Sequence, residues 1–486
     1  MTLPVAVIGA GPVGLAAAAH LVRYQQPFLV LEAGDGPASA VREWGHVRTF
    51  SPWRYMVDPA AGSLLTSTGW AAPDADALPT GRELIDRYLA PLAAHHAIAP
   101  HVRYHAGVTS VGRKDFDKVR TKDRDRQPFE VRLATGETID ARAIIDASGT
   151  WLRPNPAGSG GVHAAGEHAH HEHVSYGIPD VLGRERRRYA GKQVLVVGSG
   201  HSAFNVILDL LQLLHEVPTT QVTWAMRRDT LDAVWGGGSA DALEARGELG
   251  QRAKRAVESG AIRVITPYRI RKIAEHLGGL RITGSVRHDE VSVHADEMIV
   301  CTGFRPDLQM LSEVRLRLDP LLECPTSLGP LIDPNEHSCG TVRPHGAREL
   351  AHPEKDFYIV GMKSYGRAPT FLLATGYEQT RSVVAMLSGD VAAAERVELV
   401  LPETGVCNTT LPASAGGCCG GPASVSVLET LAERRPDLAI SHADGGQPTV
   451  HVCCTDDAVA KVEGKSGCGC GTPEPVLLQL GVARQR

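Results

Sequence analysis

Two segments of the chain carry the same pattern of an apolar strand, a glycine-rich turn and a helix, and this repeat constrains the fold more than any other feature. The first covers residues 5–22 (VAVIGAGPVGLAAAAHLV) and spaces Gly9, Gly11 and Gly14 as G-x-G-x-x-G. In this pattern the first glycine allows a tight turn, the second admits a pyrophosphate to the backbone, and the third lets the helix pack on the strand. The helix start at Pro12 would face the phosphates. This segment predicts a dinucleotide site.

The strand that follows the first turn ends in an acidic residue. After PFLVL comes Glu32, at the distance along the chain where a carboxylate accepts hydrogen bonds from a ribose. Strand, glycines, helix, second strand and acid therefore occur in the order of a complete dinucleotide-binding unit. That order is more specific than a glycine pattern alone.

The second copy of the pattern, KQVLVVGSGHSAFNVILDLLQLL, keeps two of the three glycines. Gly198 and Gly200 are in place, and Ala203 stands where the third glycine would be, a replacement that the pattern tolerates. We expect Gly198, Gly200 and Ser202, at the start of the helix, to contact a second dinucleotide.

Two arginines replace the acid in this second unit. Its following strand, QVTWAM, ends in Arg227 and Arg228. Guanidinium groups bind phosphate in a forked geometry, so the second site is expected to take a 2′-phosphate and to prefer NADPH to NADH. An exposed arginine pair that only ends a strand is the alternative.

Three other strands end in small residues. DASG begins at Asp146, CTG contains Thr302 and Gly303, and KDFYIVG ends at Gly361. The first two turns resemble those that connect the FAD and NAD(P)H domains of two-dinucleotide flavoproteins, and the third resembles the element that closes over the flavin. The resemblance implies FAD and NADPH as cofactors, with Thr302, Gly303 and Gly361 among the contacts.

This order of elements predicts an α/β fold with two Rossmann-like dinucleotide-binding domains, the NADPH domain being inserted in the FAD domain. The expected FAD domain covers residues 1–185 and 295–395, and the NADPH domain covers 186–294. Residues 396–486 form a Cys-rich C-terminal appendage.

The distribution of cysteine narrows the chemistry. The first 300 residues contain none of the ten cysteines, and seven lie after residue 400. Disulfide reductases of this architecture carry a redox cysteine pair beside the flavin or inside the NADPH domain, and neither pair is present here. Monooxygenation, with a small-molecule substrate and O2, is therefore the leading prediction, and a reductase is the rival.

The string WGHVRTFSPWRY resembles the flavoprotein monooxygenases of bacterial arsenic-resistance gene clusters, within a wider resemblance to flavin-dependent monooxygenases over residues 1–390. It implies that Trp44, Arg48 and Ser51 lie near the flavin ring and that the substrate is a soft nucleophile such as a thiol, an amine or an arsenical. Arg48 is the candidate catalytic residue, supplying positive charge where oxygen reacts. A role for Arg48 in holding a phosphate or carboxylate elsewhere is the alternative. The flavin monooxygenase signature F-x-G-x-x-x-H is not found before Gly198.

Composition excludes some partners. A net charge of −5 and no long basic run argue against nucleic acid. No apolar run reaches the length of a membrane span, and no signal-peptide pattern begins the chain, so we expect a cytoplasmic protein. A homo-oligomer is left open. Five histidines between residues 163 and 173 could ligate a metal or form a solvated loop.

The appendage concentrates soft ligands. Its closely spaced pairs are Cys418 with Cys419, Cys453 with Cys454, and Cys468 with Cys470. This spacing does not fit structural zinc sites, and adjacent thiolates favour soft ions such as Cu(I), As(III) or Hg(II). Binding of a thiophilic metal(loid) is the leading interpretation, a redox relay resembling the mobile cysteine pair of mercuric reductase is the second, and a segment without chemistry is the third. A non-enzymatic metal(loid)-binding or redox-sensing flavoprotein also remains open.

Overall fold

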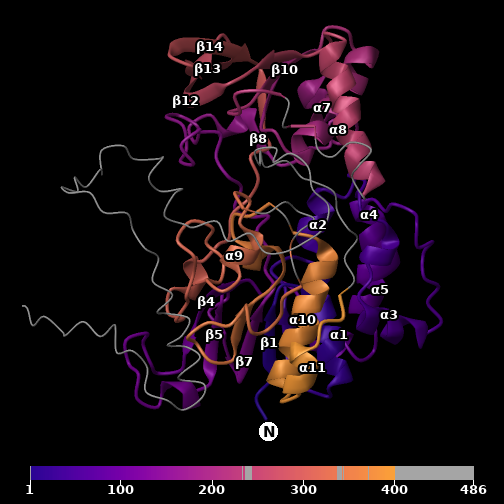
Figure 1. Cartoon of the computed structure of the whole chain (residues 1–486), viewed down its shortest axis with the longest axis vertical. Coiled ribbons are helices and arrows are strands. Elements are labelled where there is room, and N and C mark those ends of the chain that lie inside the picture. The colour runs from indigo at the N-terminus through magenta and orange to yellow at the C-terminus, as the bar shows by residue number, and fades with distance from the viewer. Residues whose placement is uncertain are drawn as a thin grey trace, which may run out of the picture. The chain divides into compact units, whose positions relative to one another are not determined.

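The structure is a computed structural model that describes residues 2–399, except 232–233, 236–242, 337–341, 343 and 370. The chain divides into two compact units, Met1–Pro412 and Ala413–Arg486. The second unit lies wholly outside the described residues, and the account below concerns the first (Figure 1).

A five-stranded parallel sheet organises what we call the first lobe. Its strand order is β16-β7-β1-β2-β3, so the first fingerprint strand is central. The bounds are β1 (Val5–Ile8), β2 (Phe28–Leu31), β3 (Val102–Arg103), β7 (Ala143–Asp146) and β16 (Phe357–Ile359).

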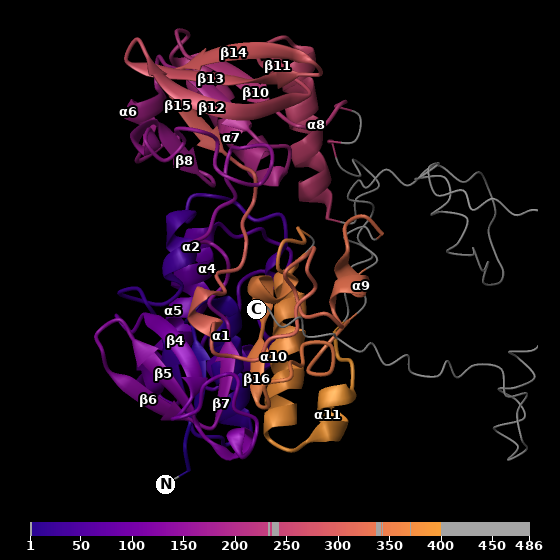
Figure 2. The same ribbon diagram turned by 90° about the vertical axis from the view of Figure 1, so that its left-hand side faces the viewer.

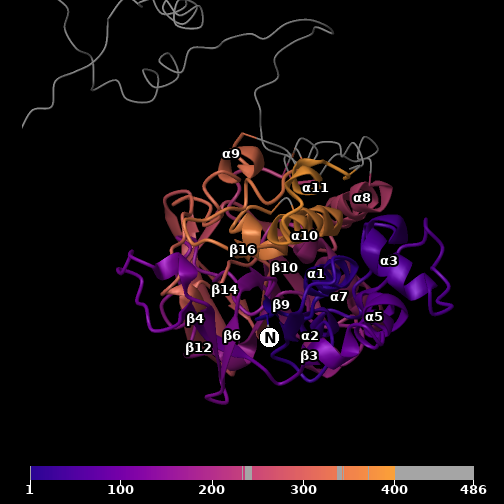
Figure 3. The same cartoon turned by 90° about the horizontal axis from the view of Figure 1, so that it is seen from below.

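Two layers cover the faces of this sheet, because successive side chains of a strand point to opposite sides. Val5 and Val7 of β1 pack with α1 (Pro12–Arg23) and α10 (Leu373–Leu387). Ala6 and Ile8 pack with the antiparallel sheet of β4 (Val108–Arg113), β5 (Phe129–Leu133) and β6 (Thr138–Ala141). Figure 2 shows the β4–β6 sheet and α10 on opposite sides of β7. Figure 3 shows α10 between α1 and α11 (Val391–Glu395).

The second lobe repeats these three layers. Its parallel sheet has the order β11-β10-β9-β15-β8. Val194 and Val196 of β9 pack with the helices, while Leu195 and Val197 pack with a three-stranded antiparallel sheet. The bounds are β8 (Val174–Tyr176), β9 (Gln193–Val197), β10 (Gln221–Ala225), β11 (Arg263–Ile265), β15 (Glu297–Val300), α7 (His201–Glu216), α8 (Glu244–Glu258), β12 (Tyr268–His276), β13 (Gly279–Val286) and β14 (Asp289–Ala295).

The α/β fold with parallel sheets is therefore confirmed. The second sheet also includes β8 and β15, which lie outside residues 186–294, because both strands pair in parallel within it. The predicted domain bounds stay predictions, and hydrogen bonding in the second lobe extends beyond them on each side.

Short helices complete the described residues. Two of them show their start signals: the Asp58 carboxylate accepts a hydrogen bond from Ala61 N at 2.9 Å, and Thr80 and Glu83 form a capping box. The bounds are α2 (Ser39–Glu43), α3 (Pro59–Thr66), α4 (Gly81–Leu84), α5 (Ala90–Ala93), α6 (Arg186–Tyr189) and α9 (Gly329–Ile332), with a π-helix at Ile85–Leu89.

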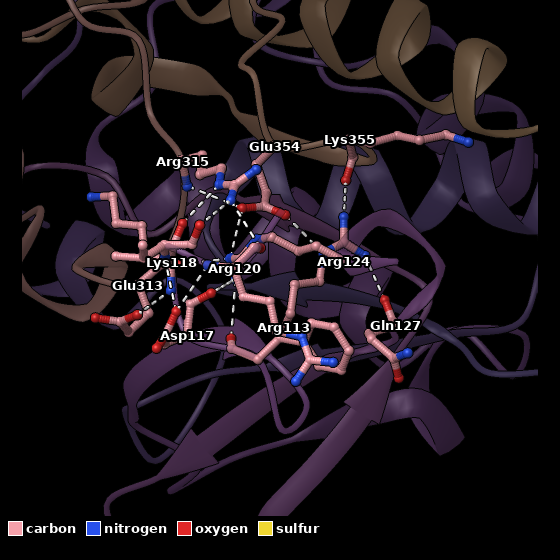
Figure 4. Close-up of polar contacts among 12 residues, drawn as sticks. Arg113, Asp117, Lys118, Arg120, Arg124, Gln127, Glu313, Arg315, Glu354 and Lys355 are labelled. Atoms are coloured by element: carbon pink, nitrogen blue, oxygen red, sulfur yellow. Dashed lines mark hydrogen bonds and ion pairs between the residues drawn. The ribbon is translucent and has the colours of Figure 1, made fainter. Parts of the chain in front are cut away.

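A buried ion cluster connects Glu354, in the segment before β16, to Arg113 and Arg124 of the first lobe (Figure 4). The Glu354 carboxylate accepts hydrogen bonds from Arg113 Nε at 2.8 Å and from Arg124 Nη2 at 2.9 Å. All three side chains are at most 2% exposed. Burial alone would raise the pKa of Glu354, but the two guanidinium groups outweigh it and the pKa is lowered.

Candidate functional site

The first glycine turn lies at the carboxyl end of β1 and has the shape of a phosphate cradle. A Cβ at Gly14 would lie 2.0 Å from the Gly9 carbonyl oxygen, so this close helix packing requires glycine. Among the described residues no atom lies within 4 Å of a Cβ built at Gly11. Helix α1 begins at Pro12, and Gly11 provides no side-chain cap, so the first N–H groups remain for a ligand.

Glu32 lies at the end of β2 as predicted and is 9% exposed. Its carboxylate accepts hydrogen bonds from Ala10 N at 2.7 Å, Gly34 N at 2.9 Å and Ser39 Oγ at 2.8 Å. The bond to Ala10 fixes the acid against the glycine turn. Turn, helix start and acid thus fit the pyrophosphate and ribose of FAD.

A buried ion pair beside this turn was not predicted from the sequence. Lys363 Nζ donates to Asp146 Oδ2 at 2.7 Å and to Ser148 Oγ at 3.0 Å, and the lysine and aspartate side chains are fully buried. The intervening Ala147 carbonyl would lie 2.9 Å from a Cβ at Gly9. Gly361, after β16, donates its N–H to Gln379 Oε1 at 2.7 Å. The pair forms because β16 lies next to β7, and no local motif marks it.

The second glycine turn repeats this geometry. A Cβ at Gly198 would lie 2.3 Å from the Cys301 carbonyl oxygen, whereas one at Gly200 would have no described atom within 4 Å. Helix α7 begins at His201, so Ser202 is its second residue. The turn therefore offers a second open helix start.

Arg227 and Arg228 follow β10, and both are exposed. Arg228 Nε donates to Ser199 Oγ at 3.3 Å, which brings this guanidinium to the glycine turn. Arg227 Nη1 donates to the Ser159 carbonyl at 2.9 Å and so points to the loop before β8. Of the two arginines, only Arg228 contacts a residue of the turn, and the binding of a 2′-phosphate stays a prediction.

The two chain segments that connect the lobes, one near Asn155 and one near Thr302, are hydrogen-bonded to each other. Thr302 Oγ1 donates to the Asn155 carbonyl at 2.8 Å, and Asn155 N donates to the Gly303 carbonyl at 2.8 Å. Thr302 and Gly303 therefore lie where the chain passes between the lobes, as the sequence predicts for such turns. Their contact with a cofactor stays a prediction.

The segment expected near the flavin ring is anchored within the first lobe. The Trp44 ring packs on Gly81, where a Cβ would lie 2.8 Å from it. Arg48 Nη1 donates to the Leu78 carbonyl at 2.5 Å, lies 4.0 Å from Glu83, and has a side chain that is 62% exposed. Ser51 lines a small pocket with Tyr55 and Leu372. The functions of Trp44, Arg48 and Ser51 stay predictions.

The histidine-rich segment is organised around a buried carboxylate. Glu167 is 1% exposed and accepts hydrogen bonds from Ala157 N at 2.9 Å, Ala164 N at 2.8 Å and Tyr176 Oη at 2.7 Å. Around it, Gly166 and His170 keep the spacing of the signature F-x-G-x-x-x-H, with Ala164 in the place of phenylalanine. The full signature is therefore absent, and only its glycine and histidine are present.

Two cysteines lie in the described part of the chain, and both are buried. Cys301 is 6% exposed and donates to the Gly177 carbonyl at 3.2 Å; Cys324 is 0% exposed. Burial raises the pKa of both thiols, that of Cys324 to about 12. Within the described residues no group of three or more His, Cys, Asp or Glu side chains could hold a metal. The six predicted metal(loid) ligands, Cys418, Cys419, Cys453, Cys454, Cys468 and Cys470, lie outside the described residues.

Two layered lobes, each with a glycine turn at an open helix start, define a protein with two dinucleotide-binding folds. The family model described as pyridine nucleotide-disulphide oxidoreductase matches residues 6–326, which is more than half of the chain. The chain belongs to this family. In its described part, no helix is long and apolar enough to span a membrane.

Curated relatives come from two kinds of enzyme. The chain is 31% identical over 220 residues to indole-3-pyruvate monooxygenase YUCCA8 of Oryza sativa subsp. indica, covering 42% of this chain and 45% of the relative. It is 25% identical over 320 residues to a ferredoxin–NADP reductase of Gluconacetobacter diazotrophicus, covering 63% of this chain and 74% of the relative. The chain thus spans less than half the length of the rice relative.

Solved structures share the fold at low sequence identity. Bacillithiol disulfide reductase from Bacillus cereus is similar with a TM-score of 0.59 and 17% identity, over 80% of this chain and 99% of that chain. The cadaverine monooxygenase of desferrioxamine biosynthesis from Erwinia amylovora is similar with a TM-score of 0.56 and 12% identity, over 86% and 100%. This fold therefore occurs with both reductase and monooxygenase activity.

Proposed function

We propose that the protein is an NADPH-dependent FAD monooxygenase that acts on a soft nucleophile. The observation that carries the proposal is the combination of two open glycine turns with thiols that are both buried in the described residues. A disulfide reductase needs an accessible thiolate, and burial keeps Cys301 and Cys324 protonated.

The residues of the first lobe suit FAD. The N–H groups at the start of α1 would bind the pyrophosphate, and Glu32, already fixed by Ala10 N, would accept from a ribose hydroxyl. FAD bound there would supply the redox chemistry, which is the transfer of a hydride from NADPH and of electrons to O2. Gly361 lies at the end of β16, the strand beside β7, and is proposed to contact the same cofactor.

The residues of the second lobe suit NADPH. The N–H groups at the start of α7, near Gly198, Gly200 and Ser202, would bind its pyrophosphate. Arg228, beside the turn, would pair with the 2′-phosphate, and Arg227 would add positive charge once released from the Ser159 carbonyl.

Two further features favour oxygenation over thiol reduction. The segment from Ala164 to His170 keeps the glycine and histidine of the monooxygenase signature. The rice relative, at 31% identity, is a monooxygenase. Arg48 is proposed to stabilise negative charge where oxygen reacts, which requires it to leave the Leu78 carbonyl, and Trp44 and Ser51 are proposed to line the same region.

The C-terminal cysteines support a second candidate function. Adjacent thiols at Cys418–Cys419 and Cys453–Cys454 could accept electrons from the flavin, or bind As(III) or another thiophilic metal(loid). Under the leading proposal this tail binds or presents the metal(loid) and does not take part in oxygen chemistry.

The deciding experiment measures NADPH oxidation by the FAD-loaded full chain with and without O2, using a panel of organic thiols, thioethers, amines and arsenite. A matched variant carries serine at all six of the paired tail cysteines. A monooxygenase consumes O2 with NADPH, places one oxygen atom from labelled O2 in the product, and is unaffected by the serine substitutions. NADPH oxidation that continues without O2 and is lost in the serine variant would establish the reductase instead.

A further inference from the structure

A cavity away from both glycine turns lies where the two connections between the lobes meet. Its volume is about 250 Å³, close to the lower end of the range of small-molecule sites, about 300–1,000 Å³. Trp151 and Phe304 line it, one from each connection, and a β-bridge between Pro154 and Phe304 fixes the two segments together. Neither a fingerprint glycine nor Arg227 or Arg228 lines it.

The apolar side of this cavity is an aromatic stack. The ring centroids of Trp151 and Phe304 are 4.7 Å apart with an interplanar angle of 27°. The backbone at Gly177 presses on the ring edges, because a Cβ there would lie 3.1 Å from Trp151 Cη2, and its φ of +85° favours glycine. Both rings keep some exposure, so a ligand can lie against them.

The polar side carries an excess of negative charge. Glu43, Arg184 and Glu185 line the cavity, two carboxylates and one guanidinium, which leaves a net charge of −1. Arg184 Nη2 lies 3.6 Å from Glu185 Oε1 and so compensates that acid. Within the described residues Glu43 makes no ion pair, and its carboxylate remains for a cation.

We propose that this cavity binds a small organic cation, an arylalkylamine whose ammonium group pairs with Glu43 and whose ring lies on Trp151 and Phe304. The aryl ring of such a ligand would bury apolar surface against the two aromatic side chains, and its ammonium group would pair with the carboxylate. The site goes beyond the proposed function, since it requires neither FAD reduction nor O2.

The test is isothermal titration of the FAD-loaded full chain with phenethylamine, and with phenylacetate as the charge-reversed probe, each with and without saturating NADP+. We expect the amine to bind and the acid not to bind. Glu43→Gln should raise the amine Kd about three- to ten-fold, and Trp151→Leu should weaken binding similarly. The control Glu290→Gln, an exposed acid on β14, should bind as the unmodified chain does.

Three results would each overturn the assignment. They are preferential binding of phenylacetate, an amine Kd that does not respond to Glu43→Gln, and competition between the amine and NADP+. Retained FAD content and an unchanged circular dichroism spectrum establish that each variant is folded. If Trp151→Leu does not fold, the amine affinity of Glu43→Gln alone tests the proposed site.

Discussion

The two lobes build the same three layers but end their second strands with opposite charge. In the first lobe Glu32 is buried and accepts three hydrogen bonds from its own chain. In the second lobe Arg227 and Arg228 are exposed, and the guanidinium group of each donates one hydrogen bond to a described residue. The Glu32 carboxylate is therefore held in place by hydrogen bonds without a ligand, whereas the two exposed arginine side chains can still rotate toward a phosphate. The repeated fold thus carries opposite charges after the second strand of each lobe, Glu32 in the first and Arg227 with Arg228 in the second.

The lobes also differ in how they satisfy a buried carboxylate. Glu354 in the first lobe accepts hydrogen bonds from two buried guanidinium groups and from Arg315 N, whereas Glu167 in the second accepts from backbone N–H groups and the Tyr176 hydroxyl, with the half-exposed His163 ring 3.2 Å away. Removing the negative charge of the carboxylate should therefore lower the free energy of unfolding more in the first lobe, because two guanidinium groups would be left buried without a counter-charge.

The largest expected effect tests this difference directly. Glu354→Gln should lower the free energy of unfolding by about 3–5 kcal/mol, because Arg113 and Arg124 lose their counter-charge. The matched change Glu167→Gln should cost less, about 1–3 kcal/mol, because one oxygen still accepts hydrogen bonds and only the NH2 group that replaces the other oxygen is left facing N–H donors. Urea denaturation followed by circular dichroism measures both, and equal costs would contradict the comparison.

A second pair of variants separates the two nucleotides. Gly11→Ala and Gly200→Ala add a methyl group that meets no described atom but occupies the approach of a pyrophosphate. The first should reduce the FAD content of the purified protein about tenfold or more, and the second should raise the NADPH Kd by a similar factor while FAD is retained. Loss of FAD in Gly200→Ala would mean that the sites are not assigned correctly.

Replacing the arginines tests the charge at the second strand end. Arg228→Gln should raise the NADPH Kd about tenfold, with a smaller rise for Arg227→Gln, because only Arg228 contacts the turn. Affinity for NADH, which has no 2′-phosphate, should hardly change in either variant. Equal losses for the two coenzymes would indicate that these arginines only support the local structure.

The smallest expected effect is on the free energy of unfolding and compares two equivalent positions, one in helix α1 and one in helix α7. His20 and Asp209 both lie nine residues after the second glycine of their turns. His20 contacts Asp58 at 3.1 Å, but Asp209 has no ion pair among the described residues, and burial raises its pKa to about 6.

Because the folded state holds this proton more tightly than the unfolded chain, the ionised carboxylate destabilises the protein above about pH 6, and this cost declines as the pH falls from about 6 to the ordinary value of 3.8. Asp209→Asn should therefore stabilise the protein by about 1–2 kcal/mol at pH 8 and very little near pH 4. Urea titrations at both pH values measure this, and the absence of any pH dependence would reject the assigned pKa.

The local geometry of each glycine turn could be predicted from the sequence. Gly9, Gly11, Gly14 and Glu32 lie within one strand–helix–strand unit, so their spacing alone determines their geometry. The sequence also shows that the phenylalanine of the monooxygenase signature is absent at residue 164, but not that this buried alanine donates its N–H to Glu167.

What the sequence by itself determined is the repeat: two strand–turn–helix units, their glycines, and the opposite charges that follow them. Hydrogen bonding and side-chain alternation within some 30 residues are enough to fix such a unit. Only the tertiary structure decided that Lys363 pairs with Asp146 across 217 residues, that Glu354 joins Arg113 and Arg124, and that Trp151 stacks on Phe304. These contacts depend on which strands become neighbours in the sheets, and strand order is a property of the packed chain rather than of any local pattern.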